Sequence, residues 1–154
     1  MATAVAANAG SYAFDDRNIR WYKLGDFEHF EFAMLDVDVP QRIVDFLGKF
    51  AANQRIFLHR HLAPTTTLVL QGEHRMYEPT GKIKEVHSAG SYTSHPADDT
   101  HRDGAAAQDA VVYYSVRGKD GTLFEIFDDN LNVIMTLGID DFISALNDQK
   151  KDSR

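Results

Sequence analysis

The chain has 154 residues, 44% of them hydrophobic, so it can bury one sizeable core and is predicted to form one domain. Its formal net charge of -7 argues against nucleic acid and anionic membranes as partners, because both require a basic face. The chain has no cysteine, which excludes disulfides, thiolate metal sites and cysteine nucleophiles, and leaves histidine and carboxylate as the strong metal ligands.

No stretch approaches the ~20 apolar residues that a membrane-spanning helix needs. The alanine-rich start lacks the basic region and the long apolar region of a signal peptide, so we expect a cytoplasmic protein with a flexible arm over residues 1–18. Residues 19–148 are predicted to form the domain, and residues 149–154 a frayed tail.

Short strands dominate the predicted elements in chain order. They are expected at residues 19–24, 30–39, 43–50, 55–61, 67–70, 73–78, 83–87, 92–95, 110–116, 122–127 and 133–137. A switch in the apolar alternation predicts a β-bulge near Met34. Residues 97–108 are predicted to be a polar loop, and residues 141–147 a short helix capped by Asp140. Such strands, separated every ~8 to 12 residues by turns, predict an all-β fold, and a double-sheet jelly roll best leaves room for a metal between its sheets.

Two histidines one residue apart stand out on the predicted strand 55–61. Because strand side chains alternate with a period of two, His59 and His61 point to the same face. Two imidazoles on one face can bind one metal ion at roughly 2 Å each. The sequence therefore predicts a metal site built around His59 and His61.

Further motifs accompany the histidine pair along the chain: His59-Arg60-His61, Ala63-Pro64, Gly72, Ala89-Gly90-Ser91-Tyr92 and Thr100-His101. Together they resemble the cupin superfamily, and within it the small three-histidine dioxygenases that cleave carbon-carbon bonds in diketones and hydroxyketones, of the acetylacetone and dihydroxyacetophenone dioxygenase type. This resemblance implies a double-stranded β-helix, the cupin jelly roll, with His101 as the third metal ligand. The first cupin motif usually carries a glutamate where this chain has Thr66, so the resemblance implies a site without that carboxylate. Glu78 matches a position that offers a carboxylate in the dihydroxyacetophenone branch.

The fourth ligand stays open at this point. Glu78 shares strand parity with His74 and the apolar Met76, which favours an inward carboxylate, but a strand that ends at Tyr77 would leave Glu78 in a solvated turn. His95 competes with His101, since the named dioxygenases tend to have a glutamate there, and it can be a ligand, face the substrate or support a ligand.

The remaining polar candidates have simpler structural explanations. His74 can line a pocket or form hydrogen bonds in the core, whereas His29 and His87 are expected at the surface. An acidic cluster in the polar loop is expected to be solvated, and three arginines are expected at the surface unless one binds a substrate carboxylate; these residues are Asp98, Asp99, Asp103, Arg75, Arg102 and Arg117. One face of the late strands forms an apolar wall, either pocket lining or plain core, from Val112, Tyr114, Phe124 and Ile126.

Three neutral imidazoles leave most of the charge of a divalent ion uncompensated, which favours an anionic chelating ligand such as an enolate. With Fe(II), we expect a dioxygenase whose partners are a small ketone substrate and dioxygen, and Zn or Ni are the alternative metals. Zinc would favour a hydrolase or isomerase, and a closed four-ligand site would favour a non-catalytic metal or ligand sensor. Aromatic residues in the segment 11–24, namely Tyr12, Phe14, Trp21 and Tyr22, predict a homodimer or homotetramer.

Overall fold

A computed structural model describes residues 1–6, 13–97, 100–118 and 120–152 of the chain. Within this part the strands are β1 Tyr22–Lys23, β2 Phe30–Asp38, β3 Ile43–Phe50, β4 Leu58–His61, β5 Thr65–Gln71, β6 Glu73–Tyr77, β7 Ile83–Ser88, β8 Tyr92–His95, β9 Arg102–Ala105, β10 Ala110–Arg117, β11 Thr122–Phe127 and β12 Val133–Gly138, followed by helix α1 Ile139–Asp152. The all-β prediction with one C-terminal helix is confirmed.

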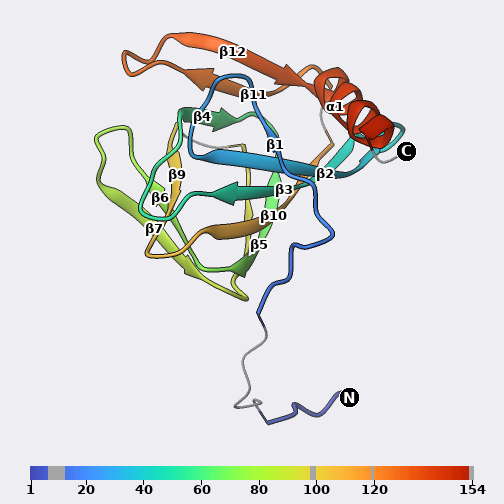
Figure 1. Cartoon of the computed structure of the whole chain (residues 1–154), viewed down its shortest axis with the longest axis vertical. Helices are drawn as coiled ribbons and strands as arrows, with labels where there is room; N and C mark the ends of the chain where they lie inside the picture. The colour runs from blue at the N-terminus through green and yellow to red at the C-terminus, as the bar shows by residue number, and fades with distance from the viewer. Residues whose placement is uncertain (7–12, 98–99, 119, 153–154) are drawn as a thin grey trace.

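The strands form one long sheet and two short ones. The six-stranded sheet has the order β1-β2-β3-β10-β5-β8, and the three-stranded sheets have the orders β12-β11-β4 and β7-β6-β9. The short sheets lie against the long one, with the chain crossing repeatedly between them (Figure 1). All paired strands run antiparallel, as a jelly roll requires. The core fills the space between the sheets, and its aromatic members include Phe46, Phe50, Tyr114 and Phe124.

Strand alternation explains most boundaries. Strands β3, β8 and β11 have the predicted bounds, and the bulge predicted near Met34 is confirmed by a register shift between Met34 and Asp36. The histidine strand is shorter than predicted and begins at Leu58, while Arg55 forms only an isolated bridge with Gly104.

The prediction of a polar loop over residues 97–108 is wrong, because this segment contains the largely buried strand β9. Gly104 explains why β9 fits there, since a Cβ at this position would overlap the backbone oxygen of Gln54. The absence of a side chain lets β9 pack closely against the segment before β4. Of the predicted acidic cluster, Asp98 and Asp99 lie outside the described residues, and Asp103 is buried on β9.

Helix α1 covers one end of the sheets and is longer than predicted. The sequence predicted a cap by Asp140, but it is the carboxylate of Asp141, in the first turn of the helix, that reaches back and accepts a hydrogen bond of 2.7 Å from the backbone N–H of Gly138. The side chain of Gln149 bonds both backbone groups of Met34 at 2.9 and 2.8 Å, and the helix continues to Asp152, into the segment 149–154 that the sequence predicted as a frayed tail. Residues 153 and 154 of that segment lie outside the described residues. Among the described residues, no helix is long and apolar enough to cross a membrane.

Part of the predicted aromatic arm packs on its own chain. The indole N–H of Trp21 donates to Asp16 at 2.9 Å, and the Lys49 ammonium lies over the indole ring. Tyr22, on β1, contacts the ring of Phe32. These contacts cover aromatic surface that the sequence assigned to a partner subunit; Ser11 and Tyr12, at the start of that segment, lie outside the described residues.

Candidate metal centre

Two strands bring four potential metal ligands together. His59 and His61 share a face of β4, as predicted. His101 lies opposite His59 in an isolated antiparallel bridge, with backbone hydrogen bonds of 3.0 and 2.9 Å in the two directions. Two residues later, Asp103 on β9 points to the same side. All four side chains are buried, and one ligand atom from each lies within 4.8 Å of the others.

Hydrogen bonds on the far side of two imidazoles set their tautomers. His59 Nδ1–H donates to the carbonyl oxygen of Phe57 at 3.1 Å. The Thr65 hydroxyl donates to the carbonyl of Ala63, so its oxygen is left to accept from His61 Nδ1–H, also at 3.1 Å. This tautomer places the lone pair of a neutral ring on Nε2, which is the arrangement found in metal-binding histidines.

Asp103 completes the group from the opposite side. Its Oδ2 lies 3.0 Å from Nε2 of His59, and its Oδ1 accepts a hydrogen bond of 2.9 Å from Nε2 of the buried His74. Two acceptor atoms 3.0 Å apart repel unless a cation lies between them, and that cation is either a proton on His59 or a shared metal. Ligands at right angles and ~2.1 Å from one metal lie ~3.0 Å apart, so the observed separation suits a shared metal.

The pKa shifts put two of the groups in the protonation state that a metal ligand needs. Burial, followed by the charges of His59 and His101, lowers the pKa of His61 well below its ordinary value and keeps the ring neutral. Burial alone would raise the pKa of Asp103, but the charge of His101 and hydrogen bonds from His101, His59 and His74 outweigh it. The pKa of Asp103 lies well below its ordinary value, so Asp103 is a carboxylate at neutral pH.

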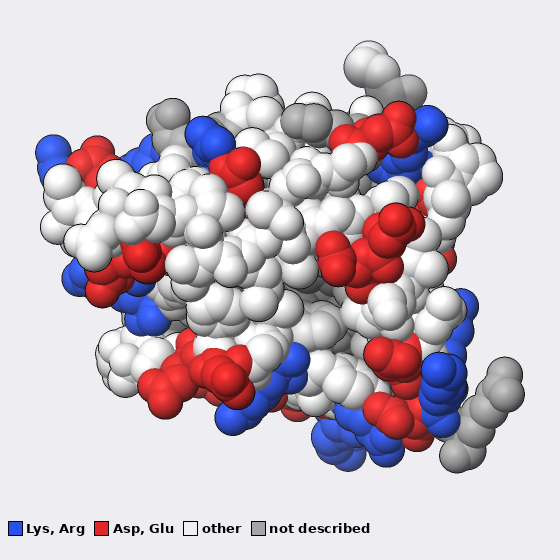
Figure 2. Space-filling model, turned by 90° about the horizontal axis from the view of Figure 1, so that it is seen from above, with Lys and Arg blue, Asp and Glu red and all other residues white. Residues whose placement is uncertain are grey.

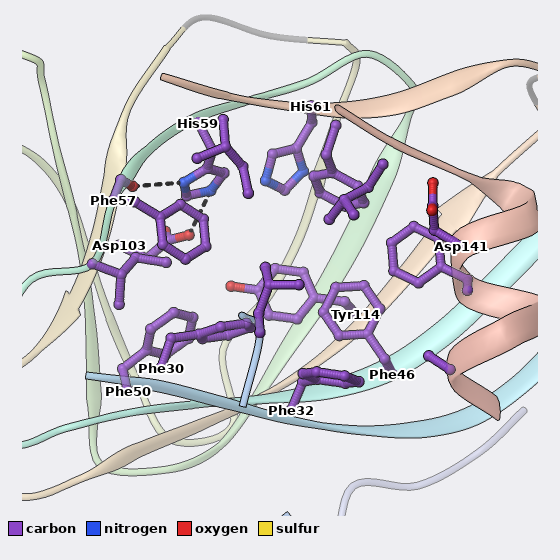
Figure 3. A pocket seen from close by; sticks show the side chains of 17 residues that line it. Phe30, Phe32, Phe46, Phe50, Phe57, His59, His61, Asp103, Tyr114 and Asp141 are labelled. Carbon is purple, nitrogen blue, oxygen red and sulfur yellow. Dashed lines mark hydrogen bonds and ion pairs between the residues drawn. The ribbon is translucent and has the colours of Figure 1, made fainter. Parts of the chain in front are cut away.

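A cavity of about 100 Å³ adjoins this group. His59, His61 and Asp103 form one end, and Asp141 from α1 lies at the other (Figure 3). Aromatic and aliphatic side chains form the walls: Leu24, Phe30, Phe32, Phe46, Phe50, Ile56, Phe57, Tyr114, Phe124, Ile126, Leu137, Phe142 and Ala145. The cavity can therefore hold a small, mainly apolar molecule with its polar end toward the histidines.

Tyr114 provides a polar group inside the apolar wall. Its ring stacks on Phe46 with centroids 4.9 Å apart, and its hydroxyl points toward the end where Asp103 lies (Figure 3). Among the described residues, this buried hydroxyl has no hydrogen-bond partner. Burial and the charge of Asp103 raise its pKa well above the ordinary value, so it stays protonated and can donate to a bound molecule.

Solved structures with the same fold come from several proteins. An RmlC-like cupin protein from Ralstonia eutropha JMP134 matches with a TM-score of 0.71 and 18% identity, over 93% of this chain and 88% of that chain. An acetylacetone dioxygenase from Acinetobacter johnsonii matches with a TM-score of 0.67 and 15% identity, over 95% and 97% of the two chains. The chain has the cupin fold. No protein-family model and no curated protein matches the sequence.

The cupin fold does not by itself define a reaction. A second protein from R. eutropha JMP134, described as a cupin-like protein of unknown function, matches with a TM-score of 0.69 and 15% identity, over 97% and 90% of the two chains. The donor set of this chain does fit a metal. Three imidazoles and a carboxylate, all buried and converging, suit iron(II), zinc or nickel, and two of the imidazoles are held in the ligand tautomer.

The structure brings together only part of the predicted ligand set. His59, His61 and His101 meet, but Glu78 does not join them, because β6 ends at Tyr77. The backbone of Glu78 forms the turn to β7, with its N–H bonded to the carbonyl of Lys82 at 2.8 Å. The inclusion of Glu78 in the ligand set is corrected accordingly, and the carboxylate that lies beside the three histidines is that of Asp103.

The other polar candidates are also placed. His95 lies beside Glu85 and His87 at the edge of the sheets, and His74 is a core residue that orients Asp103. Arg75 pairs with Glu73, Arg102 with Asp129, and Arg117 is exposed, so none of them lines the apolar cavity. Asp103 was missed, although its spacing from His101 repeats the i, i+2 spacing of His59 and His61.

Proposed function

We propose that this cupin is a non-haem iron(II) dioxygenase that cleaves a carbon-carbon bond in a small β-diketone or hydroxyketone. The observation that supports it most directly is the buried three-histidine, one-aspartate group at one end of an apolar cavity. The fold of an acetylacetone dioxygenase is consistent with this reaction, although at 15% identity it supports the fold alone.

His59, His61, His101 and Asp103 would hold the metal. Iron(II) in this group would supply redox chemistry toward dioxygen, which zinc lacks. The carbonyl of Phe57 and the hydroxyl of Thr65 accept from Nδ1–H of His59 and His61, so Nε2 is the nitrogen that each ring would offer to the metal.

The cavity walls would bind the carbon skeleton and exclude water. Tyr114 would donate its hydroxyl proton in a hydrogen bond to an oxygen of the enolate, and its raised pKa keeps that proton on the tyrosine. This bond would orient the two ketone oxygens toward the histidine end of the cavity.

Cavity size favours the smaller members of the substrate class. At about 100 Å³ it is smaller than the ~150 Å³ engineered cavity that accepts benzene. We therefore place an aliphatic β-diketone ahead of an aryl hydroxyketone.

An oxygen electrode tests the reaction. The iron(II) form should consume oxygen in proportion to an aliphatic β-diketone and yield carboxylic and carbonyl products, whereas the zinc and metal-free forms should not. His61→Gln should abolish oxygen uptake. His29→Gln, which changes an exposed histidine just before β2, should not. No oxygen uptake by the iron form with any diketone or hydroxyketone would refute the dioxygenase.

A zinc protein is the second candidate, and Asp103 favours it. Four protein donors can close a tetrahedral zinc shell, which is typical of a structural or sensing site, while release of Asp103 would open a position for hydrolysis or isomerisation. Turnover by the zinc form without oxygen would support the hydrolase or isomerase. A tightly bound zinc without turnover of any ketone would support the sensor.

The proposed partners are the ketone and dioxygen, without nucleic acid or membrane, in a cytoplasmic protein. On the face shown in Figure 2, acidic and basic side chains lie interspersed, and such a face lacks the continuous basic patch that nucleic acid or an anionic membrane would require. We also propose a homodimer or homotetramer, because the outer strand β12 exposes Val133 and Ile134. Light scattering that shows only a 17.3 kDa species at micromolar concentration would contradict this assembly.

A further inference from the structure

A second group of metal-type side chains lies outside the centre described above. Glu85 and His87 are two residues apart on β7 and so share a face, while His95 is the last residue of β8. Strands β7 and β8 follow one another in the chain but belong to different sheets, each as an outer strand. The three side chains therefore face one another where the chain crosses from one sheet to the other.

Their spacing suits a metal with little movement. One Glu85 oxygen, Oε2, lies 2.8 Å from Nε2 of His87 and 3.5 Å from Nε2 of His95, and one ligand atom from each residue lies within 4.8 Å of the others. Tetrahedral ligands ~2.0 to 2.1 Å from zinc lie ~3.3 to 3.4 Å apart, between the two measured separations.

An ion pair alone does not satisfy all three side chains. It can account for the contact between Glu85 and His87. The contact of 3.5 Å between Nε2 of His95 and the same carboxylate is within ion-pair range but is not a hydrogen bond, so this nitrogen, which is shielded from solvent, has no hydrogen-bond partner among the described residues. A metal bound by all three would satisfy that nitrogen and would draw its distance to the carboxylate into the range of two ligands on one ion.

We propose that Glu85, His87 and His95 form a second metal site, specific for a divalent transition metal and best suited to zinc. Two imidazoles and one carboxylate make a donor set that zinc uses with a water at the fourth position. The side chains are 29%, 20% and 33% exposed, so the group lies near the surface, although Nε2 of His95 is itself shielded from solvent.

Binding at this site joins two outer strands that share no backbone ladder. A metal held by Glu85 and His87 on one side and by His95 on the other cross-links β7 to β8. His95 also lines a small cavity of about 20 Å³ that reaches His61 and His101, so the same metal fixes one wall of that cavity.

Zinc stoichiometry of the full-length protein tests the proposal. After chelator treatment, titration with zinc against a chromophoric competitor, with elemental analysis of the dialysed product, should give two equivalents per chain in wild type. His87→Gln and Glu85→Gln should each lose one equivalent of zinc or lower its affinity ~100-fold or more. Loss of a residue that only forms a hydrogen bond to a ligand typically lowers metal affinity ~10- to 100-fold. The matched control is His29→Gln, which removes a histidine 3.7 Å from Glu28 without a third donor beside it, and it should keep two.

Amide hydrogen exchange provides an independent readout. Zinc should slow exchange in β7 and β8 of wild type and should have no such effect in His87→Gln. Zinc stoichiometry and affinity that are the same in wild type and in both β7 variants, whether at one equivalent or at two, would overturn the second site. Neither measurement uses substrate or oxygen, so its result is separate from that of the dioxygenase test.

Discussion

Replacing Tyr114 by phenylalanine should make the empty protein more stable and the enzyme slower. The substitution removes one hydroxyl and keeps the ring that stacks on Phe46. A buried hydroxyl without a partner costs ~1 to 3 kcal/mol. We therefore expect the free energy of unfolding of metal-free, substrate-free protein to rise by ~1 kcal/mol, or ~2 to 4 °C in Tm for a chain of this length.

Activity should change in the opposite direction. A hydrogen bond to a charged oxygen contributes ~1.5 to 3 kcal/mol, so losing it should reduce kcat/KM of the iron form by ~10- to 150-fold. Urea unfolding and an oxygen electrode measure the two effects on the same preparation. Tyr113→Phe is the matched control, since Tyr113 alternates with Tyr114 along β10 and is not part of the cavity wall.

Two results would refute this reasoning. A loss of stability of ~1 kcal/mol or more in Tyr114→Phe would mean that the hydroxyl is already satisfied in the empty protein. A kcat/KM within twofold of wild type would mean that the hydroxyl does not contact the substrate. Either result would leave the histidine group untouched, so the role of Tyr114 is tested separately from the metal.

Three further changes test the centre and its support. Because His61 is held neutral, the metal-free protein should lose stability as the pH falls below ~6.5, by at most ~1.4 kcal/mol per pH unit from this group, and His61→Gln should flatten that slope in urea titrations. Asp103→Asn should weaken metal binding at least ~10-fold in a competition titration, while Glu78→Gln, the matched control in a turn, should leave it unchanged; equal effects would contradict the choice of Asp103. Gly104→Ala should lower the free energy of unfolding by ~2 kcal/mol or more and reduce metal content, because the new Cβ meets the backbone oxygen of Gln54; wild-type stability would contradict the close packing of β9.

Local periodicity was enough to place His59 and His61 on one strand face, because two residues on the same strand need no knowledge of the fold. His101 lies far from His59 and His61 in the sequence, and only the resemblance to cupins linked it to the two histidines. The structure shows the physical link, a backbone bridge between His59 and His101. No pattern within either segment encodes that pairing.

Strand ends were the least predictable feature, and they determine which carboxylate lies beside the three histidines. Glu78 has the right parity for the interior, but β6 ends one residue before it, and a turn follows. Asp103 has the right parity on a strand that was predicted as loop, because the sequence around β9 is small and polar rather than alternating. The polar composition of the segment favoured a loop, although Gly104 and Ala105 are small enough for the strand to be buried.

The two groups of potential metal ligands are built on pairs with the same i, i+2 spacing: His59 with His61, His101 with Asp103, and Glu85 with His87. Each pair guarantees two donors on one strand face, and none of them alone makes a site. The first two pairs meet because His59 on β4 forms a bridge with His101, the residue just before β9. The third meets His95 because the chain changes sheets between β7 and β8. Spacing along a strand therefore predicts which donors lie on the same face, whereas the contacts between strands determine which of these donors are close enough to bind one metal.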